Sequence, residues 1–183
     1  GLVSYWQFNE GSGDETVDNV SGNDGAMDYM DHNAWIDSTI PFGPGFADSQ
    51  LVNNPGFYDF TDTNFRMTLN NAVTNEPITV TKLETNPNMN PLDVDYVFDD
   101  QYWAINSFGD EAYNCDLTFS NIEGIAESDV NNPAFIKLYS RDGNSDEDWT
   151  LTDSSINVQI TGVWNEVIFE NVDHFSQFIL SRK

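Results

Sequence analysis

Short segments in which apolar and polar residues alternate recur along the chain, and Gly, Pro, Asn and Asp separate them. In residues 64–70, for example, Phe65, Met67 and Leu69 share one face of an extended strand, while Arg66 and Thr68 share the other. Alternation with a period of two is typical of a strand with one buried face. Similar patterns occupy residues 1–8, 77–84, 94–106, 113–121, 134–140, 148–152, 156–162, 166–172 and 176–181.

The number and spacing of these segments predict an all-β fold. Many short strands at intervals of about ten residues are typical of an antiparallel β-sandwich, of jelly-roll or immunoglobulin-like kind. Residues 94–106 fit either two short strands or one bent strand. Helical periodicity is nearly absent. A chain of 183 residues with 14% aromatic residues can bury a substantial core.

Proline and glycine interrupt the chain twice in residues 41–46, which indicates a boundary there. We therefore expect an N-terminal segment of residues 1–45 and a β-sandwich module of residues 46–183. The first segment has one clear strand pattern and is too short and too poor in apolar runs to fold alone. It should pack on the main domain or be exchanged with a partner.

Charge excludes several classes of partner. The chain has 31 acidic and 6 basic residues, a formal net charge of −25, so it lacks the clustered Lys and Arg that nucleic-acid binding needs. No apolar run approaches the roughly 20 residues of a membrane span, so we expect no membrane insertion.

Cys115, the only cysteine, alternates with Leu117 and Phe119, which predicts a buried and inert thiol.

Two parts of the chain resemble known families. Residues 2–13 (LVSYWQFNEGSG), 18–27 (DNVSGNDGAM) and 35–43 (WIDSTIPFG) resemble the start of laminin-G-like, concanavalin-A-like domains. The remainder resembles β-sandwich modules of multidomain proteins from bacteria with type IX secretion, in PITVTKLETNPNMNP, QYWAIN, CDLTFS, IKLYSRD, DWTL and VDHFSQFIL. These resemblances imply a jelly-roll start, an extracellular location, and neighbouring adhesive, enzymatic or carbohydrate-binding domains.

The acidic stretch of residues 141–153 is a candidate calcium loop. Its oxygen-bearing residues alternate, and a hard cation such as Ca²⁺ takes six to eight oxygen ligands. The candidate ligands are Asp142, Asn144, Asp146, Asp148 and Asp153. The first positions resemble an EF-hand loop, but Glu147 stands where a glycine is needed. The alternative is an acidic hairpin tip between two strands.

The opening loop is a weaker cation candidate. Its oxygens come from Asp14, Asp18, Asn19, Asn23 and Asp24, and its glycines permit positive φ angles. Ordinary turn chemistry explains the same composition.

Tryptophans supply the candidate ligand-binding residues. Trp6, Trp103 and Trp149 fall within strand patterns and should build the core. Trp35 and Trp164 lie beside turns, where each could stack on a sugar ring or fill a gap in the packing of the domain.

Catalysis has little support in the sequence. A Ser-His-Asp arrangement needs His32 or His174 beside a nucleophile, and Ser176 is expected to be a surface residue of an alternating strand. The sequence contains no G-x-S-x-G motif, no H-E-x-x-H motif and no phosphate-binding glycine loop. Chance pairs of carboxylates are inevitable among 31 acids.

We therefore expect a non-catalytic extracellular module of a bacterial surface or secreted protein, acting in adhesion or glycan binding, with Ca²⁺ as the candidate cofactor. The expected partner is a polysaccharide or a cell-surface glycan. One alternative is a structural subunit that assembles with copies of itself into an extracellular filament, by β-strand exchange. A remote alternative is a polysaccharide hydrolase.

Overall fold

The computed structural model describes residues 3–6, 12–26, 44–73, 76–98, 100–107, 112–142 and 148–183. The chain divides into two compact units, Gly1–Thr39 and Ile40–Lys183. In the first unit, β1 (Glu15–Thr16) pairs antiparallel with β2 (Gly25–Ala26). Whether residues 1–45 pack on the main domain or are exchanged with a partner stays a prediction.

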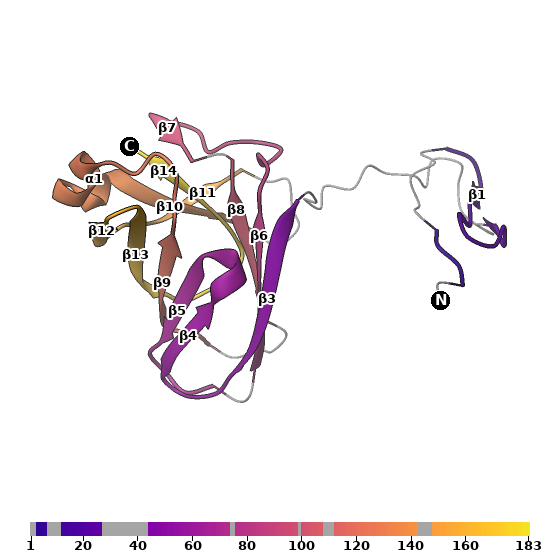
Figure 1. Ribbon diagram of the computed structural model, residues 1–183, viewed down its shortest axis with the longest axis horizontal. Coiled ribbons are helices and arrows are strands. Elements are labelled where there is room, and N and C mark those ends of the chain that lie inside the picture. The colour runs from indigo at the N-terminus through magenta and orange to yellow at the C-terminus, as the bar shows by residue number, and fades with distance from the viewer. Residues whose placement is uncertain are drawn as a thin grey trace. The chain divides into compact units, whose positions relative to one another are not determined.

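The second unit is an antiparallel β-sandwich, which confirms the predicted fold class (Figure 1). The larger sheet has seven strands. Six of them follow the order β11-β10-β14-β8-β6-β3, and the seventh, β7, pairs with the C-terminal end of β14. Its strands are β3 (Gly45–Val52), β6 (Glu76–Leu83), β7 (Tyr96–Val97), β8 (Tyr102–Ser107), β10 (Ile136–Arg141), β11 (Thr150–Ser154) and β14 (Gln177–Arg182). Gly45 permits the close approach of β3 to β6, since a Cβ there would lie 2.2 Å from the Lys82 carbonyl oxygen.

The smaller sheet has five strands, in the order β12-β13-β9-β5-β4. These strands are β4 (Gly56–Phe60), β5 (Phe65–Leu69), β9 (Cys115–Ser120), β12 (Asn157–Thr161) and β13 (Trp164–Val172). Helical structure in the described part of the chain consists of α1 (Glu127–Asn131) and two 3₁₀ turns, Thr61–Thr63 and Pro133–Phe135. None of these described helices is long and apolar enough to cross a membrane.

The core lies between the inner faces of the two sheets. Phe65, Met67 and Leu69 of β5 are each at most 1% exposed, as the alternation of their strand predicts. Phe119 of β9 contacts three other aromatic rings, among them Trp103 of β8 at a centroid distance of 4.8 Å. Burial of these large rings is the main source of stability for such a sandwich.

A second apolar cluster covers part of the outer face of the seven-stranded sheet. It contains Leu83, Tyr102, Tyr139, Trp149 and Ile179. The indole of Trp149 donates a hydrogen bond of 2.6 Å to the backbone oxygen of Met89. The guanidinium of Arg141 lies 4.4 Å from the centre of the Trp149 ring and donates to the side chain of Asn88. Residues 88 and 89, in the connection between β6 and β7, therefore lie against this face.

Predictions about single residues had mixed outcomes. Trp103 and Trp149 are buried, as expected, but Trp6 is 37% exposed and donates from its indole to the oxygen of Asn23 in the first unit. The expectation that Trp6 builds the core is wrong, because the strand pairing of the described residues 3–6 is limited to one isolated bridge, between Trp6 and Asp18. Cys115 is fully buried, as predicted, and the inertness of its thiol stays a prediction.

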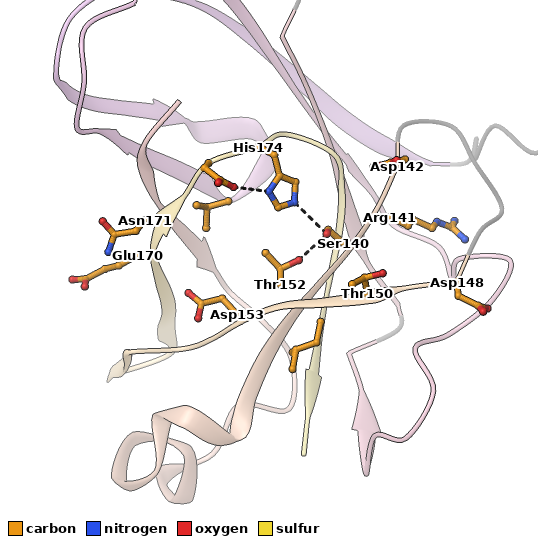
Figure 2. Close-up of a pocket in the computed structure, with 13 residues that line it drawn as sticks. Ser140, Arg141, Asp142, Asp148, Thr150, Thr152, Asp153, Glu170, Asn171 and His174 are labelled. Carbon is orange, nitrogen blue, oxygen red and sulfur yellow. Dashed lines mark hydrogen bonds and ion pairs between the residues drawn. The ribbon is translucent and has the colours of Figure 1, made fainter. Parts of the chain in front are cut away.

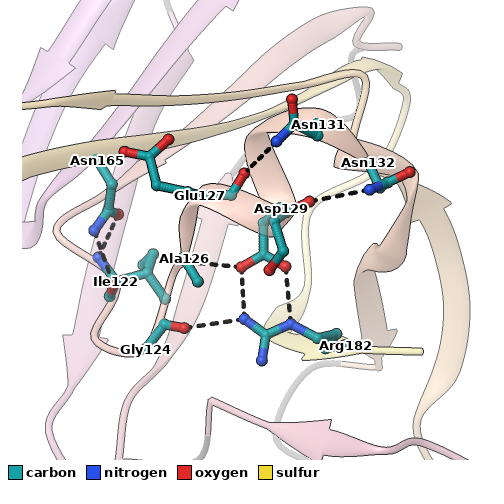
Figure 3. Close-up of polar contacts among 10 residues, drawn as sticks. Ile122, Gly124, Ala126, Glu127, Asp129, Asn131, Asn132, Asn165 and Arg182 are labelled. Atoms are coloured by element: carbon teal, nitrogen blue, oxygen red, sulfur yellow. Dashed lines mark hydrogen bonds and ion pairs between the residues drawn. The ribbon is translucent and has the colours of Figure 1, made fainter.

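The short helix α1 is attached to the last strand by a buried carboxylate (Figure 3). Asp129 is 1% exposed and accepts two hydrogen bonds from the guanidinium of Arg182 on β14. Its Oδ2 also accepts from the backbone nitrogen of Ala126, at the start of the helix. The same guanidinium donates to the oxygen of Gly124. Asp129 thus joins the beginning of α1 to the C-terminal strand.

Candidate functional site

Trp164 owes its exposure to a tight turn. The register of β12 and β13 pairs Thr161 with Trp164, so only Gly162 and Val163 connect the strands. Gly162 has a φ of +66°, and a turn with positive φ at its first central residue favours glycine there. Trp164 is the first residue of β13 after this turn and is 60% exposed.

A pocket of about 230 Å³ lies beside the Trp164 side chain. Hydrogen-bonding side chains from the five-stranded sheet and its loops surround it. They are Asp59, Thr61, Asn64, Arg66, Ser120, Asn121, Asn165 and Glu166. Successive side chains of a strand point to opposite faces of the sheet. Residues 59, 66, 120 and 166 each adjoin a buried residue of the inner face, so they lie on the outer face. The buried neighbours are Phe60, Phe65, Phe119 and Val167. The pocket therefore opens on that face.

Two asparagines in left-handed conformation form part of the pocket wall. Asn64 has a φ of 54° and Asn121 has a φ of 56°. Asparagine tolerates this region better than most residues with a side chain. The amide nitrogen of Asn121 donates to the amide oxygen of Asn64 over 3.2 Å. This contact fixes one loop against the other and leaves further amide donor and acceptor capacity on each side chain.

The charged residues of the pocket pair with each other. The guanidinium of Arg66 forms an ion pair with Glu166, two strands away, and lies 5.5 Å from the ring centre of Phe57. Phe57 is 60% exposed. The outer face of the small sheet thus has an exposed aromatic side chain near each end, Trp164 on β13 and Phe57 on β4, with a neutralised ion pair between them.

Three of the five predicted calcium ligands line a second, larger pocket of about 630 Å³ (Figure 2). Asp142, Asp148 and Asp153 belong to this lining, while Asn144 and Asp146 lie outside the described residues. Strands β10 and β11 pair antiparallel, so the acidic stretch does join two strands of a hairpin. Within the described ranges, no three His, Cys, Asp or Glu side chains are grouped closely enough to hold a metal ion. The calcium site stays a prediction.

In the opening loop, the carboxylate of Asp18 is occupied by donors of its own unit. It accepts from the backbone nitrogens of Tyr5, Val20 and Asn23 and from the hydroxyl of Ser21. Burial raises the pKa of Asp18, but these hydrogen bonds outweigh it and hold the pKa well below its usual value. The arrangement favours turn chemistry over cation binding for Asp18.

The remaining candidates have separate outcomes. Trp35 and His32 lie outside the described residues. His174 lies in the connection between β13 and β14. The expectation for Ser176 is wrong, because this residue is 6% exposed and its hydroxyl donates to the backbone oxygen of Arg141. Ser176 directly precedes β14, so the alternation of buried and exposed side chains within a strand does not apply to it.

Most of the pocket beside Trp164 has no signal in the sequence. Asp59, Asn64 and Asn121 come from three separate segments, and only the pairing of β4, β5, β9 and β13 brings them together. The one local signal is the pair of asparagines that directly precede or follow strands, since Asn is favoured where φ is positive. No protein family, curated protein or solved structure matches this chain.

Proposed function

We propose that the sandwich is an extracellular glycan-binding module of a bacterial surface or secreted protein, with its ligand site in the pocket beside Trp164. The observation that carries the proposal is an indole 60% exposed that lines a pocket of about 230 Å³ together with several hydrogen-bonding side chains. An exposed aromatic face next to a few well-placed polar groups is typical of a small-molecule site. The acidic, soluble composition and the family resemblance support the extracellular location.

The chemistry of the pocket fits a sugar ring. A pyranose presents C–H groups on one face, which an indole can cover, and hydroxyls around its edge that both donate and accept. Asp59 and Glu166 offer acceptors, whereas Asn64 and Asn121 offer both donors and acceptors. These groups are attached to paired strands or to left-handed loops, so little ordering is required when a ligand binds.

Electrostatics favour an uncharged glycan. Arg66, the cation that lines this pocket, is paired with Glu166. The formal net charge of −25 makes the approach of a uronate or a sulfate unfavourable. The expected ligands are therefore neutral polysaccharides.

Affinity electrophoresis through gels containing neutral β-glucan, xylan or mannan tests the proposal. We expect at least one neutral gel to retard the parent, and Trp164→Ala to abolish that retardation without lowering the thermal midpoint. Val163→Ala is the matched control, because Val163 is the adjacent residue, apolar and 90% exposed. Equal loss in both variants would indicate nonspecific adsorption. Retention by the Trp164→Ala variant, or a parent that no neutral gel retards, contradicts the proposal.

One observation supports the filament alternative. Strand β3 has eight residues in register with β6 and ends the order of its sheet. Its Phe46 and Leu51 are 51% and 60% exposed. An edge strand of this length is a site where another strand can add. Light scattering of the chain with and without residues 1–8 tests this alternative, which requires assemblies that disappear on deletion.

A further inference from the structure

The larger pocket contains a directed chain of hydrogen bonds that ends on a serine (Figure 2). Nε2 of His174 lies 3.2 Å from the hydroxyl oxygen of Ser140, and Nδ1 of His174 lies 3.0 Å from Oδ1 of Asp173. The hydroxyl of Thr152 donates to Ser140 over 2.7 Å. These groups come from β10, β11 and the connection between β13 and β14. Separate segments thus meet at one hydroxyl.

The protonation of this chain follows from its acceptors. The neighbouring His174 holds the pKa of Asp173 below its usual value, so the carboxylate is ionised and can only accept. In the neutral imidazole, Nδ1 then carries the proton, and the lone pair of Nε2 faces Ser140. Because Thr152 already donates to Ser140, the Ser140 hydroxyl directs its own hydrogen to Nε2. A serine hydrogen-bonded to a neutral imidazole is the activated form of this nucleophile.

A β-bulge places Thr152 beside Ser140. Leu138 pairs with Asp153 and Tyr139 pairs with Leu151, so Thr152 is the extra residue of the bulge and lies opposite no residue of β10 in the strand register. Bulges of this kind redirect a side chain and are frequent beside active sites. The hydroxyl of Thr152 is thereby held 2.7 Å from Ser140, within reach of an oxygen on an acyl carbon attached to Ser140.

We propose that Ser140 is the nucleophile of a hydrolytic site for short, uncharged acyl esters of polar alcohols. In the first step, Oγ of Ser140 bonds to the acyl carbon while Nε2 of His174 takes the hydroxyl proton. The carbonyl electrons move to the carbonyl oxygen, to which Thr152 donates. The bond to the alcohol oxygen then breaks, and that oxygen takes the proton from Nε2. Water repeats the sequence on the acyl-serine, which releases the carboxylic acid and restores Ser140.

The pocket sets the substrate class. Its volume of about 630 Å³ accommodates a small ester, and its lining contains the carboxylates of Asp142, Asp148, Asp153, Glu170 and Asp173. Five acids disfavour an anionic acyl group, and their polarity favours an alcohol with further hydroxyls. The side chain of Asp173 is 83% exposed, so it is a positioning residue that orients His174, and solvent weakens its effect.

Labelling with diisopropyl fluorophosphate and turnover of p-nitrophenyl acetate test the site. We expect one adduct per chain, on Ser140, and a fall in turnover of roughly 100-fold or more in Ser140→Ala and His174→Gln. Ser181→Ala is the matched control, because Ser181 is buried on β14, outside this pocket, and should leave label and rate unchanged. Asp173→Asn should lower kcat by about tenfold with little change in KM.

Three results would overturn the proposal: no adduct on Ser140 in the folded chain, a Ser140→Ala variant as active as the parent, or equal kcat/KM for a neutral and an anionic acyl ester. Circular dichroism establishes that each variant is folded. If Ser140→Ala does not fold, Ser140→Cys retains the size of the side chain. Its thiol should then react with iodoacetamide faster than buried Cys115, and a rate no faster than that of Cys115 contradicts an activated position.

Discussion

The guanidinium of Arg182 binds the carboxylate of Asp129 through two hydrogen bonds, of 2.9 and 2.6 Å, across 53 residues of sequence. Tyr96 and Phe98 lie beside the same guanidinium, with ring centres 5.7 and 5.4 Å away. Removal of either partner of such an ion pair should destabilise the fold, because the other charge is then left partly desolvated and unpaired.

Asp129→Asn should lower the free energy of unfolding by about 2–3 kcal/mol, less than for a fully buried pair because Arg182 is 29% exposed. Urea unfolding measures the change. Glu127→Gln, an exposed acid on the same helix, is the control and should stay within about 0.5 kcal/mol of the parent. Equal stability of the Asp129→Asn variant and the parent would show that the pair is not stabilising.

Acid should destabilise the N-terminal unit. Because the folded pKa of Asp18 is lowered, its stabilising contribution is fully present above the unfolded value of about 4 and is lost as the pH falls toward the folded value. Amide hydrogen exchange at Tyr5, Val20 and Asn23 measures this loss. Asp18→Asn should remove the protection already at pH 7. Protection that persists in this variant would contradict the role given to the carboxylate.

Cys115 should not react with thiol reagents in the folded protein. Burial, followed by the charges of Asp116 and Asp173, raises the pKa of the Cys115 thiol to about 12, so the reactive thiolate is scarce at pH 8. Labelling with DTNB should proceed only as fast as the chain unfolds and should become rapid in guanidinium chloride. Fast labelling of the folded protein would mean that solvent reaches the interior beside β9.

The calcium prediction is tested by thermal unfolding with Ca²⁺ and then with EDTA. A cation bound only by the folded chain adds about 2.7 kcal/mol to the free energy of unfolding when its concentration is a hundredfold above Kd. We expect Ca²⁺ to raise the midpoint and Asp153→Asn to remove most of that increase. Asp62→Asn, an exposed acid near β4, should not. Identical midpoints in Ca²⁺ and EDTA would make the loop an acidic hairpin tip.

The strands could be predicted from the sequence because each has a local cause. In β5 and β9, the apolar residues occupy alternate positions and are all buried, so the period of two is sufficient. The pattern over residues 94–106 left two alternatives open, and the structure has two short strands there, β7 and β8. Helix α1 gave no signal, since five residues are too few for helical periodicity to appear.

The pockets could not be predicted, because their parts are joined by strand pairing rather than by spacing. Trp164 was a candidate on account of its turn, but Asp59 and Asn121 reach it from separate segments. The sequence likewise placed His174 next to Ser176, whereas its partner in the fold is Ser140, 34 residues earlier. A register shift in one hairpin, which moves Thr152 out of alternation, is also invisible in composition.

The two outer faces of the sandwich are unequal, because its own chain covers Tyr139, Trp149 and Ile179 on one sheet while Trp164 and Phe57 stay exposed on the other. A ligand that binds the exposed face fixes the orientation of the module as well as its position. On a fibrous or planar glycan, every bound copy would present the same side to the medium. Any domain joined to it would then point in a common direction, which gives a surface coat polarity without contacts between copies.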